Sequence, residues 1–353
     1  MKSLKKIYLT HERRLLTLVF IGGFVFDALT LTRVDGVIDN LILTTYLILA
    51  ALSIFLWNTS SFIRSKETLH RLLPAITQFS FGALFSGFVV FYSRGGFFVG
   101  HLPFFLLLLI LILGNERLHR QYQRLTFQMS IFFVTTYLYS LFILPIILKQ
   151  LGLPTFILGG MVSLALSFGL IHAIHRRADP TITQSKKTLI ASIAFIYLII
   201  NILYFTNTIP PLPLSLKEIG VYHSITRQQG NYIVTGEKTP WNYFRLTEQF
   251  HAHPGQPVYI FSSVFAPTEL STTIVHEWFY FDETNKNWVL RETINFPIIG
   301  GRDSGYRGYS MKEDISAGLW RVDVKTERRQ LIGRVRFKMI SAIVPSQLTT
   351  SIK

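Results

Sequence analysis

Long hydrophobic runs with almost no charged residues dominate the first 207 residues and predict membrane-spanning helices. An α-helix needs about 20 mostly apolar residues to cross the hydrocarbon core of a bilayer. Seven segments have this pattern: residues 15–32, 41–57, 73–93, 97–114, 126–148, 153–175 and 188–205. The fourth is the weakest, because its uninterrupted apolar core covers only residues 102–113, and a re-entrant segment is the alternative there.

Basic residues are distributed unevenly among the connections between these segments. The N-terminal segment and the connections at residues 58–72, 115–125 and 176–187 carry fifteen Lys and Arg residues. The intervening connections carry only Arg33, Arg94 and Lys149. Short loops rich in Lys and Arg stay on the cytoplasmic side of a membrane protein. The pattern therefore predicts a cytoplasmic N-terminus and, because the span count is odd, a C-terminal half outside the cytoplasm.

The pattern changes after residue 207. A Pro-rich stretch at residues 208–219 cannot continue a helix, because proline lacks a backbone donor, and we expect a linker there. Short alternating segments separated by turn residues follow and predict β-strands. They lie at residues 221–225, 232–235, 243–247, 258–265, 272–281, 288–294, 319–325 and 331–340.

The last two of these segments alternate most clearly. Trp320, Val322 and Val324 are interleaved with charged residues, which is typical of a sheet with one buried and one wet face. The expected fold is a membrane all-α bundle of about seven transmembrane helices, followed by an all-β antiparallel sandwich of immunoglobulin-like kind. The expected domains are 1–207 (multi-pass transmembrane), 208–219 (linker) and 220–353 (extracytoplasmic β-sandwich).

Composition supports the membrane assignment and narrows the chemistry. The 353-residue chain has a mean hydropathy of +0.36 and is 49% hydrophobic, too apolar for an ordinary soluble protein. It contains no cysteine, which excludes disulfides, thiolate metal sites and cysteine nucleophiles. Most of the net charge of +15 lies in the first 207 residues, where it reflects membrane topology. Nucleic acid is therefore not an expected partner.

Four motifs in the second half resemble a known family. They are residues 274–278 (IVHEW), 300–308 (GGRDSGYRG), 318–324 (GLWRVDV) and 332–337 (IGRVRF). Together they are similar to the C-terminal domain of bacterial proteins known as domain of unknown function 2914. Members of that family often carry a multi-pass membrane region in front. No activity is established for the family, so the resemblance implies an architecture and not a chemistry.

The glycine-rich stretch 300–308 is the first candidate binding site. Its glycines permit backbone conformations that other residues avoid. Arg302 and Arg307 are spaced to fork around a carboxylate or phosphate, with Asp303 between them. Tyr306 offers a ring on which a sugar can stack. The alternative is an ordered surface loop whose arginines pair with nearby carboxylates.

His276 and Trp278 form a second candidate ligand-binding site on one predicted strand. A metal site would require His251 and His253 to meet His276 and Glu277. The sequence lacks a His-Glu-x-x-His motif, because no second histidine follows His276 at that spacing. The alternative is that His276 only hydrogen-bonds within the sheet and Trp278 belongs to the core. We expect no metal site and no cofactor.

Basic residues also line the polar face of the last predicted hairpin. They are Arg321, Lys325, Arg328, Arg329, Arg334, Arg336 and Lys338. Such a stripe suits an anionic lipid headgroup or an acidic envelope polymer. The alternative is a solvated sheet face whose charges prevent edge-to-edge aggregation.

Acidic residues in and after the first predicted span form the candidate site of the membrane half. Asp27 lies inside the span, and Asp35 and Asp39 follow it. Ionisable residues at membrane depth are costly and often mark ion or proton paths. The alternative is that Asp27 pairs with a polar neighbour such as Gln78 or Gln128.

These features predict a binding or interaction protein rather than an enzyme, and no catalytic residue is identified. The partners expected are the lipid bilayer and an envelope polymer, an anionic lipid headgroup or a partner protein. The alternative is a transporter or a lipid-linked transferase with its site near Asp27, Asp35 and Asp39. We expect a cytoplasmic (inner) membrane location, with the N-terminus in the cytoplasm and the C-terminal domain in the periplasm.

Overall fold

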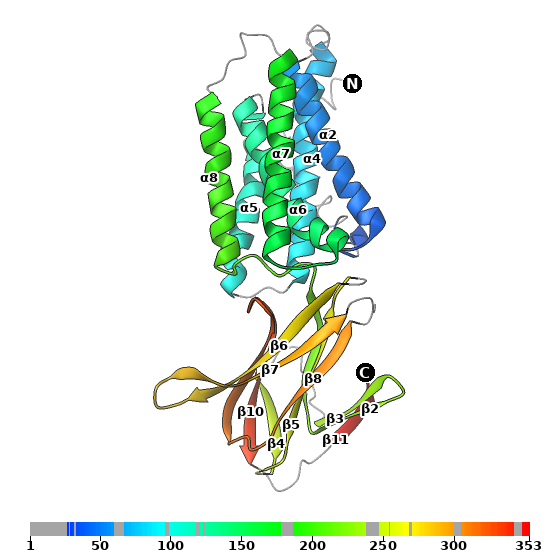
Figure 1. The fold of residues 1–353 in the computed structure, drawn as a ribbon, viewed down its shortest axis with the longest axis vertical. Helices are drawn as coiled ribbons and strands as arrows, with labels where there is room; N and C mark the ends of the chain where they lie inside the picture. The colour runs from blue at the N-terminus through cyan, green and yellow to red at the C-terminus, as the bar shows by residue number, and fades with distance from the viewer. Residues whose placement is uncertain are drawn as a thin grey trace, which may run out of the picture. The chain divides into compact units, whose positions relative to one another are not determined.

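Two compact units make up the chain. The helical unit comprises Met1–Leu148 and Leu153–Ile209, and the β unit comprises Lys149–Gly152 and Pro210–Lys353 (Figure 1). The computed structural model describes residues 27, 29–31, 33–59, 67–95, 99–117, 121–122, 124–177, 186–237, 247–253, 255–267, 270–299, 305–341 and 348–353.

Six α-helices are described in the helical unit. They are α2 (Val37–Thr59), α4 (Glu67–Arg94), α5 (Leu102–Arg117), α6 (Leu125–Leu148), α7 (Leu153–Arg177) and α8 (Lys186–Phe205), with the short 3-10 helix η1 (Val99–His101) before α5. All but α5 are long and apolar enough to cross a membrane. The first predicted span, residues 15–32, lies almost entirely outside the described residues. The count of seven spans therefore stays a prediction.

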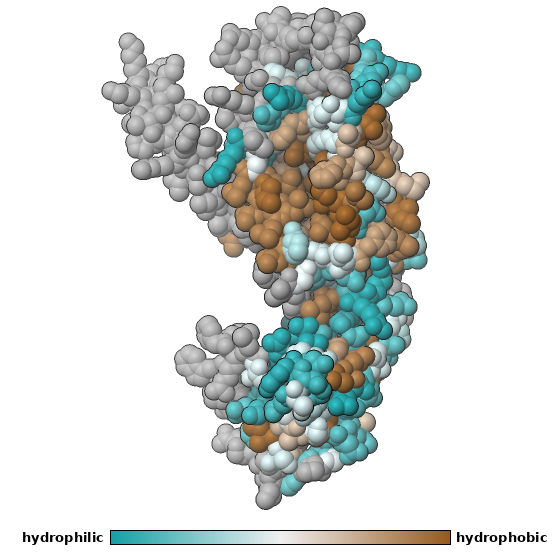
Figure 2. Space-filling model, turned by 90° about the vertical axis from the view of Figure 1, so that its left-hand side faces the viewer, coloured by the Kyte–Doolittle hydropathy of each residue, from teal (hydrophilic) through white to brown (hydrophobic). Residues whose placement is uncertain are grey.

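The helices differ in how much of their surface is buried. More than half of the apolar stretch of α4 and of α6 is buried within the unit, whereas only about a quarter is buried in α2, α7 and α8. Large apolar side chains such as Ile110, Met161 and Phe195 remain exposed. On the face drawn in Figure 2, hydrophobic residues cover the helices and hydrophilic residues gather on the β unit. An exposed apolar surface of this kind suits a lipid environment.

Hydroxyl side chains form hydrogen bonds between neighbouring helices. Ser53 of α2 lies 2.7 Å from Thr77 of α4, and Thr44 of α2 lies 2.7 Å from the hydroxyl of Tyr139 in α6. Interhelical hydrogen bonds help to hold helices together in a bilayer, where water cannot satisfy these groups.

Eleven strands are described in the β unit, against eight that were predicted. They are β1 (Ser215–Tyr222), β2 (Ser224–Gln228), β3 (Asn231–Glu237), β4 (Glu248–Ala252), β5 (Val258–Phe265), β6 (Ser271–Asp282), β7 (Asn287–Ile299), β8 (Tyr306–Lys312), β9 (Gly318–Thr326), β10 (Leu331–Ser341) and β11 (Leu348–Ile352). They form a five-stranded sheet in the order β4-β10-β9-β6-β7 and two three-stranded sheets, β1-β5-β8 and β11-β3-β2.

The five-stranded sheet and the β1-β5-β8 sheet share a hydrophobic core. One cluster joins Trp278, Val322 and Phe337 of the first sheet to Val258 and Ile260 of β5 in the second. These residues gather on one side because successive side chains of a strand point to opposite faces. The β-rich C-terminal half is thus confirmed, while its immunoglobulin-like arrangement stays a prediction.

One strand pair corrects the expectation of a wholly antiparallel fold. β4 runs parallel to β10, with Glu248 opposite Phe337 and His251 opposite Ile340. The other strand pairs described are antiparallel. A parallel pair needs a long crossover, and the chain from β5 to β9 provides it here. β4 was not predicted because Phe250 is its only large apolar residue.

Two short segments of the chain join the β unit unexpectedly. β1 begins at Ser215, inside the stretch assigned to a linker, and Leu214 before it is fully buried. Leu151, in the connection between α6 and α7, packs against the cluster that contains Leu214. The β unit is therefore built from two parts of the sequence, and the segment 210–353 alone lacks Leu151.

Candidate binding surface of the β unit

A charged surface covers the side of the five-stranded sheet opposite its core. We call it the basic face and define it by Glu277 of β6, Arg321, Asp323 and Lys325 of β9, Arg329 of the β9–β10 turn, and Arg334, Arg336 and Lys338 of β10. The strand register sets Asp323 between Glu277 and Arg334. The same register sets Arg321 directly opposite Arg336.

Two buried carboxylates fix the geometry of the basic face. The Asp323 side chain is 1% exposed, and the guanidinium of Arg334 donates to it twice, with Nε 2.5 Å from Oδ1 and Nη2 2.9 Å from Oδ2. The Glu277 side chain is 4% exposed and accepts a hydrogen bond of 2.5 Å from Lys325 Nζ. A buried carboxylate is costly unless its charge is matched in good geometry. These ion pairs therefore hold Arg334 and Lys325 in place.

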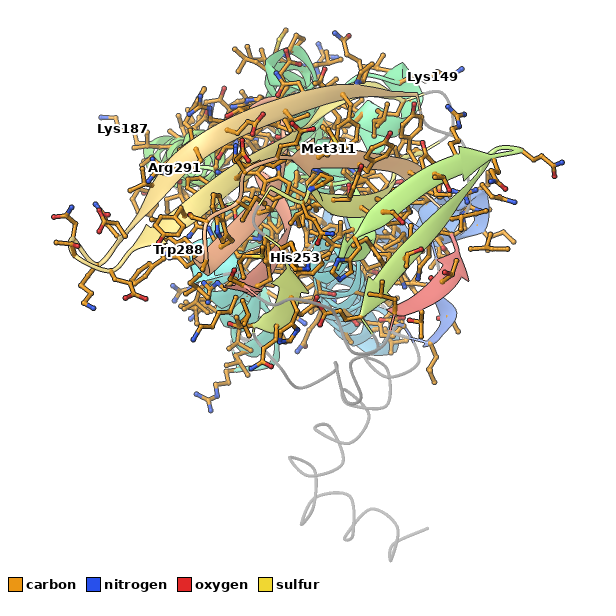
Figure 3. The ribbon with its side chains drawn as sticks, turned by 90° about the horizontal axis from the view of Figure 1, so that it is seen from below. Lys149, Lys187, His253, Trp288, Arg291 and Met311 are labelled. Carbon is orange, nitrogen blue, oxygen red and sulfur yellow. The ribbon has the colours of Figure 1, made fainter. Side chains whose placement is uncertain are left out.

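Arg321 lies over two aromatic rings. Its Cζ is 4.3 Å from the ring centre of Phe279 and 4.7 Å from that of Trp288, which is labelled on β7 in Figure 3. Burial lowers the pKa of Arg321, and the guanidinium of Arg336 adds to this effect, while Asp323 opposes it. Attraction between the cation and the ring faces orients the Arg321 guanidinium.

Arg336 lacks a partner for its charge among the described residues. Its Nε is buried and has no hydrogen-bond acceptor there. The Nε of Arg321 lies 3.3 Å from Asp323 Oδ1 but also lacks an aligned acceptor. Like charges directly opposite each other destabilise a strand pair. Within the described part of the chain, the basic face therefore carries unmatched positive charge where β9 meets β10.

The glycine-rich candidate is only partly described. Arg302 and Asp303 lie outside the described residues, whereas Tyr306 and Arg307 belong to strand β8 and not to a loop. The ring of Tyr306 packs against a core cluster, and the carbonyl oxygen of Arg307 accepts a hydrogen bond of 3.3 Å from Tyr232. The structure does not bring Tyr306 or Arg307 into the basic face.

His276 and Trp278 lie in the core, and both are fully buried. The indole Nε1 of Trp278 donates to Ser310 Oγ at 3.1 Å, and the same oxygen lies 2.8 Å from His276 Nδ1. His276 Nε2 lies 2.8 Å from Ser262 Oγ. Burial lowers the pKa of His276 to about 3, so its ring is neutral at pH 7. The chain of hydrogen bonds links β5, β6 and β8 and satisfies polar groups inside the core.

His251 belongs to a different cluster. Its Nδ1 lies 2.8 Å from one carboxylate oxygen of Glu237, and His223 Nε2 lies 3.3 Å from the other. Burial is the main cause of a lowered pKa at His223. Within the described ranges, no group of three or more His, Asp or Glu side chains could hold a metal ion.

The match to a protein family falls on the strands that carry the basic face. Residues 271–339 match the model of the family described as "Protein of unknown function (DUF2914)". The resemblance expected from the sequence motifs is confirmed. The matched segment runs from β6 to β10 and therefore includes every residue that defines the basic face.

Among the solved structures that match this chain, two have low similarity to it. One is an immunoglobulin-like protein from Pseudomonas aeruginosa, 10% identical, with a TM-score of 0.22, covering 36% of this chain and 96% of its own. The other is an alkylpurine DNA glycosylase from Pseudomonas fluorescens bound to DNA containing an abasic site analog, 10% identical, with a TM-score of 0.23, covering 87% and 99%. TM-scores this low establish neither the fold nor the role of this chain. No curated protein matches it.

The aspartates of the helical unit have local partners. Asp35 forms an ion pair with Arg33 at 3.0 Å, and Oδ2 of Asp39 accepts a hydrogen bond of 2.9 Å from the Arg33 backbone. Asp27 lies close to Ser86 of α4 and to Tyr46 of α2. Local contacts thus account for the charges of Asp35 and Asp39 without a ligand.

The amides considered as partners for Asp27 hydrogen-bond elsewhere. Gln128 of α6 accepts a hydrogen bond of 2.9 Å from Asn58 of α2. Gln78 of α4 donates to the backbone of Asn115 in α5 at 2.9 Å. Gln128 thus links α6 to α2, and Gln78 links α4 to α5, so both amides contribute to packing within the bundle.

Sequence reasoning missed the aromatic support of the basic face. Phe279 lies two residues after Glu277 on β6, so alternation places both on the same face. That spacing was a usable signal for Phe279. Trp288 gave no comparable signal, because its place beside Arg321 depends on how β6 pairs with β7 across a register shift.

Proposed function

We propose that this protein is a membrane-anchored, non-catalytic binding protein whose β unit binds an anionic component of the cell envelope through the basic face. The observation that carries the proposal is the imbalance of charge, with six Lys and Arg residues around two carboxylates. Both carboxylates are buried and engaged, whereas the cations Arg329 and Lys338 are exposed. An exposed surplus of cations attracts polyanions by an interaction that salt screens.

The order of the segments along the chain supports placing both parts of the β unit on the same side of the membrane. Lys149–Gly152 precedes α7, and the rest of the β unit follows α8. If α7 and α8 each cross the bilayer once, both parts of the β unit emerge on the same side. The distribution of Lys and Arg among the loops favours the outside of the cytoplasm for that side.

Binding of a carboxylate polymer tests the proposal. We would measure the binding of polyglutamate to the full chain in uncharged detergent micelles at low and high salt. The double variant Arg329→Gln, Lys338→Gln should bind more weakly and depend less on salt, because two exposed cations of the basic face are gone.

A matched control removes the same charge from other sheets. Lys217 of β1 and Arg227 of β2 are both exposed, and the variant Lys217→Gln, Arg227→Gln should bind as the unaltered chain does. Equal losses in the two double variants would show that total charge, and not the basic face, governs binding. No binding by the unaltered chain at low salt would overturn the proposal.

A further inference from the structure

We propose that Arg336 and Arg321 together bind a phosphate group, an inference that rests on the proposed function of the basic face and names its ligand. The two arginines stand opposite each other on β10 and β9. Each has a buried Nε without an aligned hydrogen-bond acceptor among the described residues. An oxyanion between them would accept from both guanidinium groups and remove their mutual repulsion.

The neighbouring carboxylates, Asp323 and Glu277, are already paired and do not supply the oxyanion between Arg321 and Arg336. Both oxygens of Asp323 are engaged by the fork of Arg334, and Glu277 is engaged by Lys325. The described residues contain no ion pair to Arg336. Among the described residues, no carboxylate is left to match its charge, which suits a bound anion.

Contacts within the protein already orient the side chains of Arg321 and Arg334, and a ligand would not displace these contacts. The guanidinium carbon Cζ of Arg321 lies over the rings of Phe279 and Trp288. A guanidinium that stacks on a ring keeps its N–H groups free at its edge, where they can donate to a ligand. Arg334, the next residue of β10 on this face, is fixed by Asp323. Little side-chain freedom is lost at Arg321 when a ligand binds, which favours affinity.

The arrangement suits a phosphate better than a carboxylate. A single arginine fork occupies both oxygens of a carboxylate, as Arg334 does with Asp323. Two guanidinium groups that approach from separate strands need an acceptor with more oxygens. A phosphate group offers them, whether it belongs to a lipid headgroup, a phosphate polymer or the free ion.

Stabilisation by inorganic phosphate tests the site. We would follow thermal unfolding of the full chain in uncharged detergent micelles while phosphate replaces chloride at constant ionic strength. A ligand that binds only the folded state raises the unfolding midpoint as its concentration rises. We expect this rise in the unaltered chain and its loss in Arg336→Gln.

Two further variants separate this site from general charge effects. Arg227→Gln removes the same charge from β2, in another sheet, and should keep the phosphate-dependent rise. Arg336→Lys keeps the charge but not the fork, and it should lose most of the rise. Equal losses in Arg336→Gln and Arg227→Gln, or no rise in the unaltered chain, would overturn the inference. Polyglutamate binding that persists in either case would leave the proposed function standing.

The source of the phosphate is a separate arm of the experiment. We would compare the effect of Arg336→Gln on binding of soluble polyphosphate and on co-flotation with vesicles of phosphatidylglycerol. A loss in only the vesicle assay would assign the site to a lipid headgroup, and a loss in only the polyphosphate assay would assign it to a polymer. An unchanged result in both assays would contradict the phosphate site.

Discussion

At the residue scale, the burial of Asp323 explains why cations gather around it. Arg334 donates to it twice, Arg321 Nε lies 3.3 Å away and Lys325 Nζ lies 3.7 Å away. In the folded protein this carboxylate has almost no contact with water, so these cations supply the favourable interactions that water would otherwise provide.

Removing the charge of Asp323 should destabilise the β unit strongly. Asp323→Asn leaves Arg334 without its carboxylate in a partly buried place, and breaking a buried ion pair in this way costs about 3 kcal/mol. Denaturant unfolding of the full chain in detergent micelles measures the loss. Glu283→Gln, at the exposed β6–β7 turn, is the control and should change the free energy of unfolding by less than about 0.5 kcal/mol. A similar effect of the two substitutions would contradict the role given to Asp323.

The buried His276 should make the stability of the β unit depend on pH. Its pKa is about 3 in the folded chain, against about 6.5 for an exposed histidine in the unfolded chain. Below pH 6.5 only the unfolded chain takes up the proton, so stability is complete above that pH and falls progressively toward pH 3. Between pH 7 and pH 5 we expect a loss of about 2 kcal/mol.

Denaturant titrations at the two pH values measure this loss. In His276→Gln the side chain does not titrate, so the difference between pH 7 and pH 5 should shrink even though the variant is less stable at both. The same difference in both proteins would show that other groups cause the pH dependence. His223, whose pKa burial also lowers, is the first alternative to examine.

At the element scale, the hairpin of β9 and β10 was predictable and its register was not. Strict alternation of apolar and charged residues in both strands indicated which side faces the core. The pairing of Arg321 with Arg336, however, depends on a register shift between Leu331 and Gly333. A bulge of this kind moves every later pair by one position, and the alternation of a single strand contains no information about it.

Other strands carried weaker signals. β4 has one large apolar residue, Phe250, and gains its stability as an edge strand beside β10. β8 begins inside the glycine-rich stretch 300–308, and Gly308 made Tyr306–Lys312 resemble a loop. That glycine is required by packing, because an added Cβ would lie 2.5 Å from the ring of Phe296 on β7.

Gly333 should be required for the packing of β10 against β1. An added Cβ there would overlap the side chain of Leu216. We expect Gly333→Ala to cost about 1–3 kcal/mol, because overpacking forces neighbouring side chains or backbone to move. Denaturant unfolding of Gly333→Ala, Leu216→Ala and the double variant measures the coupling. In the Leu216→Ala background the glycine substitution should cost much less, and additive effects would contradict the proposed contact.

At the scale of the whole molecule, the sequence already indicated a membrane part followed by a β-rich part. Hydrophobic runs revealed the long helices because a bilayer requires length and apolarity in one continuous segment. The inclusion of Lys149–Gly152 in the β unit was not predictable, because it depends on Leu151 packing against residues more than sixty positions away in sequence, such as Leu214. The candidate site was predictable as a stripe of charge, but the sequence did not indicate that Arg336 has no ion-pair partner among the described residues.

Leu151 should stabilise the β unit although it lies between two helices in the sequence. Leu151→Asp places a charge against the cluster that contains Leu214, and we expect a loss of about 2 kcal/mol or more in the unfolding of the β unit. Protease resistance of the β strands in the full chain reports this loss. Leu153→Asn, at the exposed first residue of α7, is the control and should leave that resistance unchanged.

The central claim is that the β unit lies outside the cytoplasm, and cysteine labelling tests it most directly. The chain has no cysteine, so Glu283→Cys at the β6–β7 turn and Lys187→Cys at the start of α8 each introduce a single thiol at an exposed position. On cells with an intact cytoplasmic membrane, a membrane-impermeant maleimide should label Glu283→Cys at once and Lys187→Cys only after permeabilisation. Labelling of Lys187→Cys with protection of Glu283→Cys would place the β unit in the cytoplasm and contradict the account.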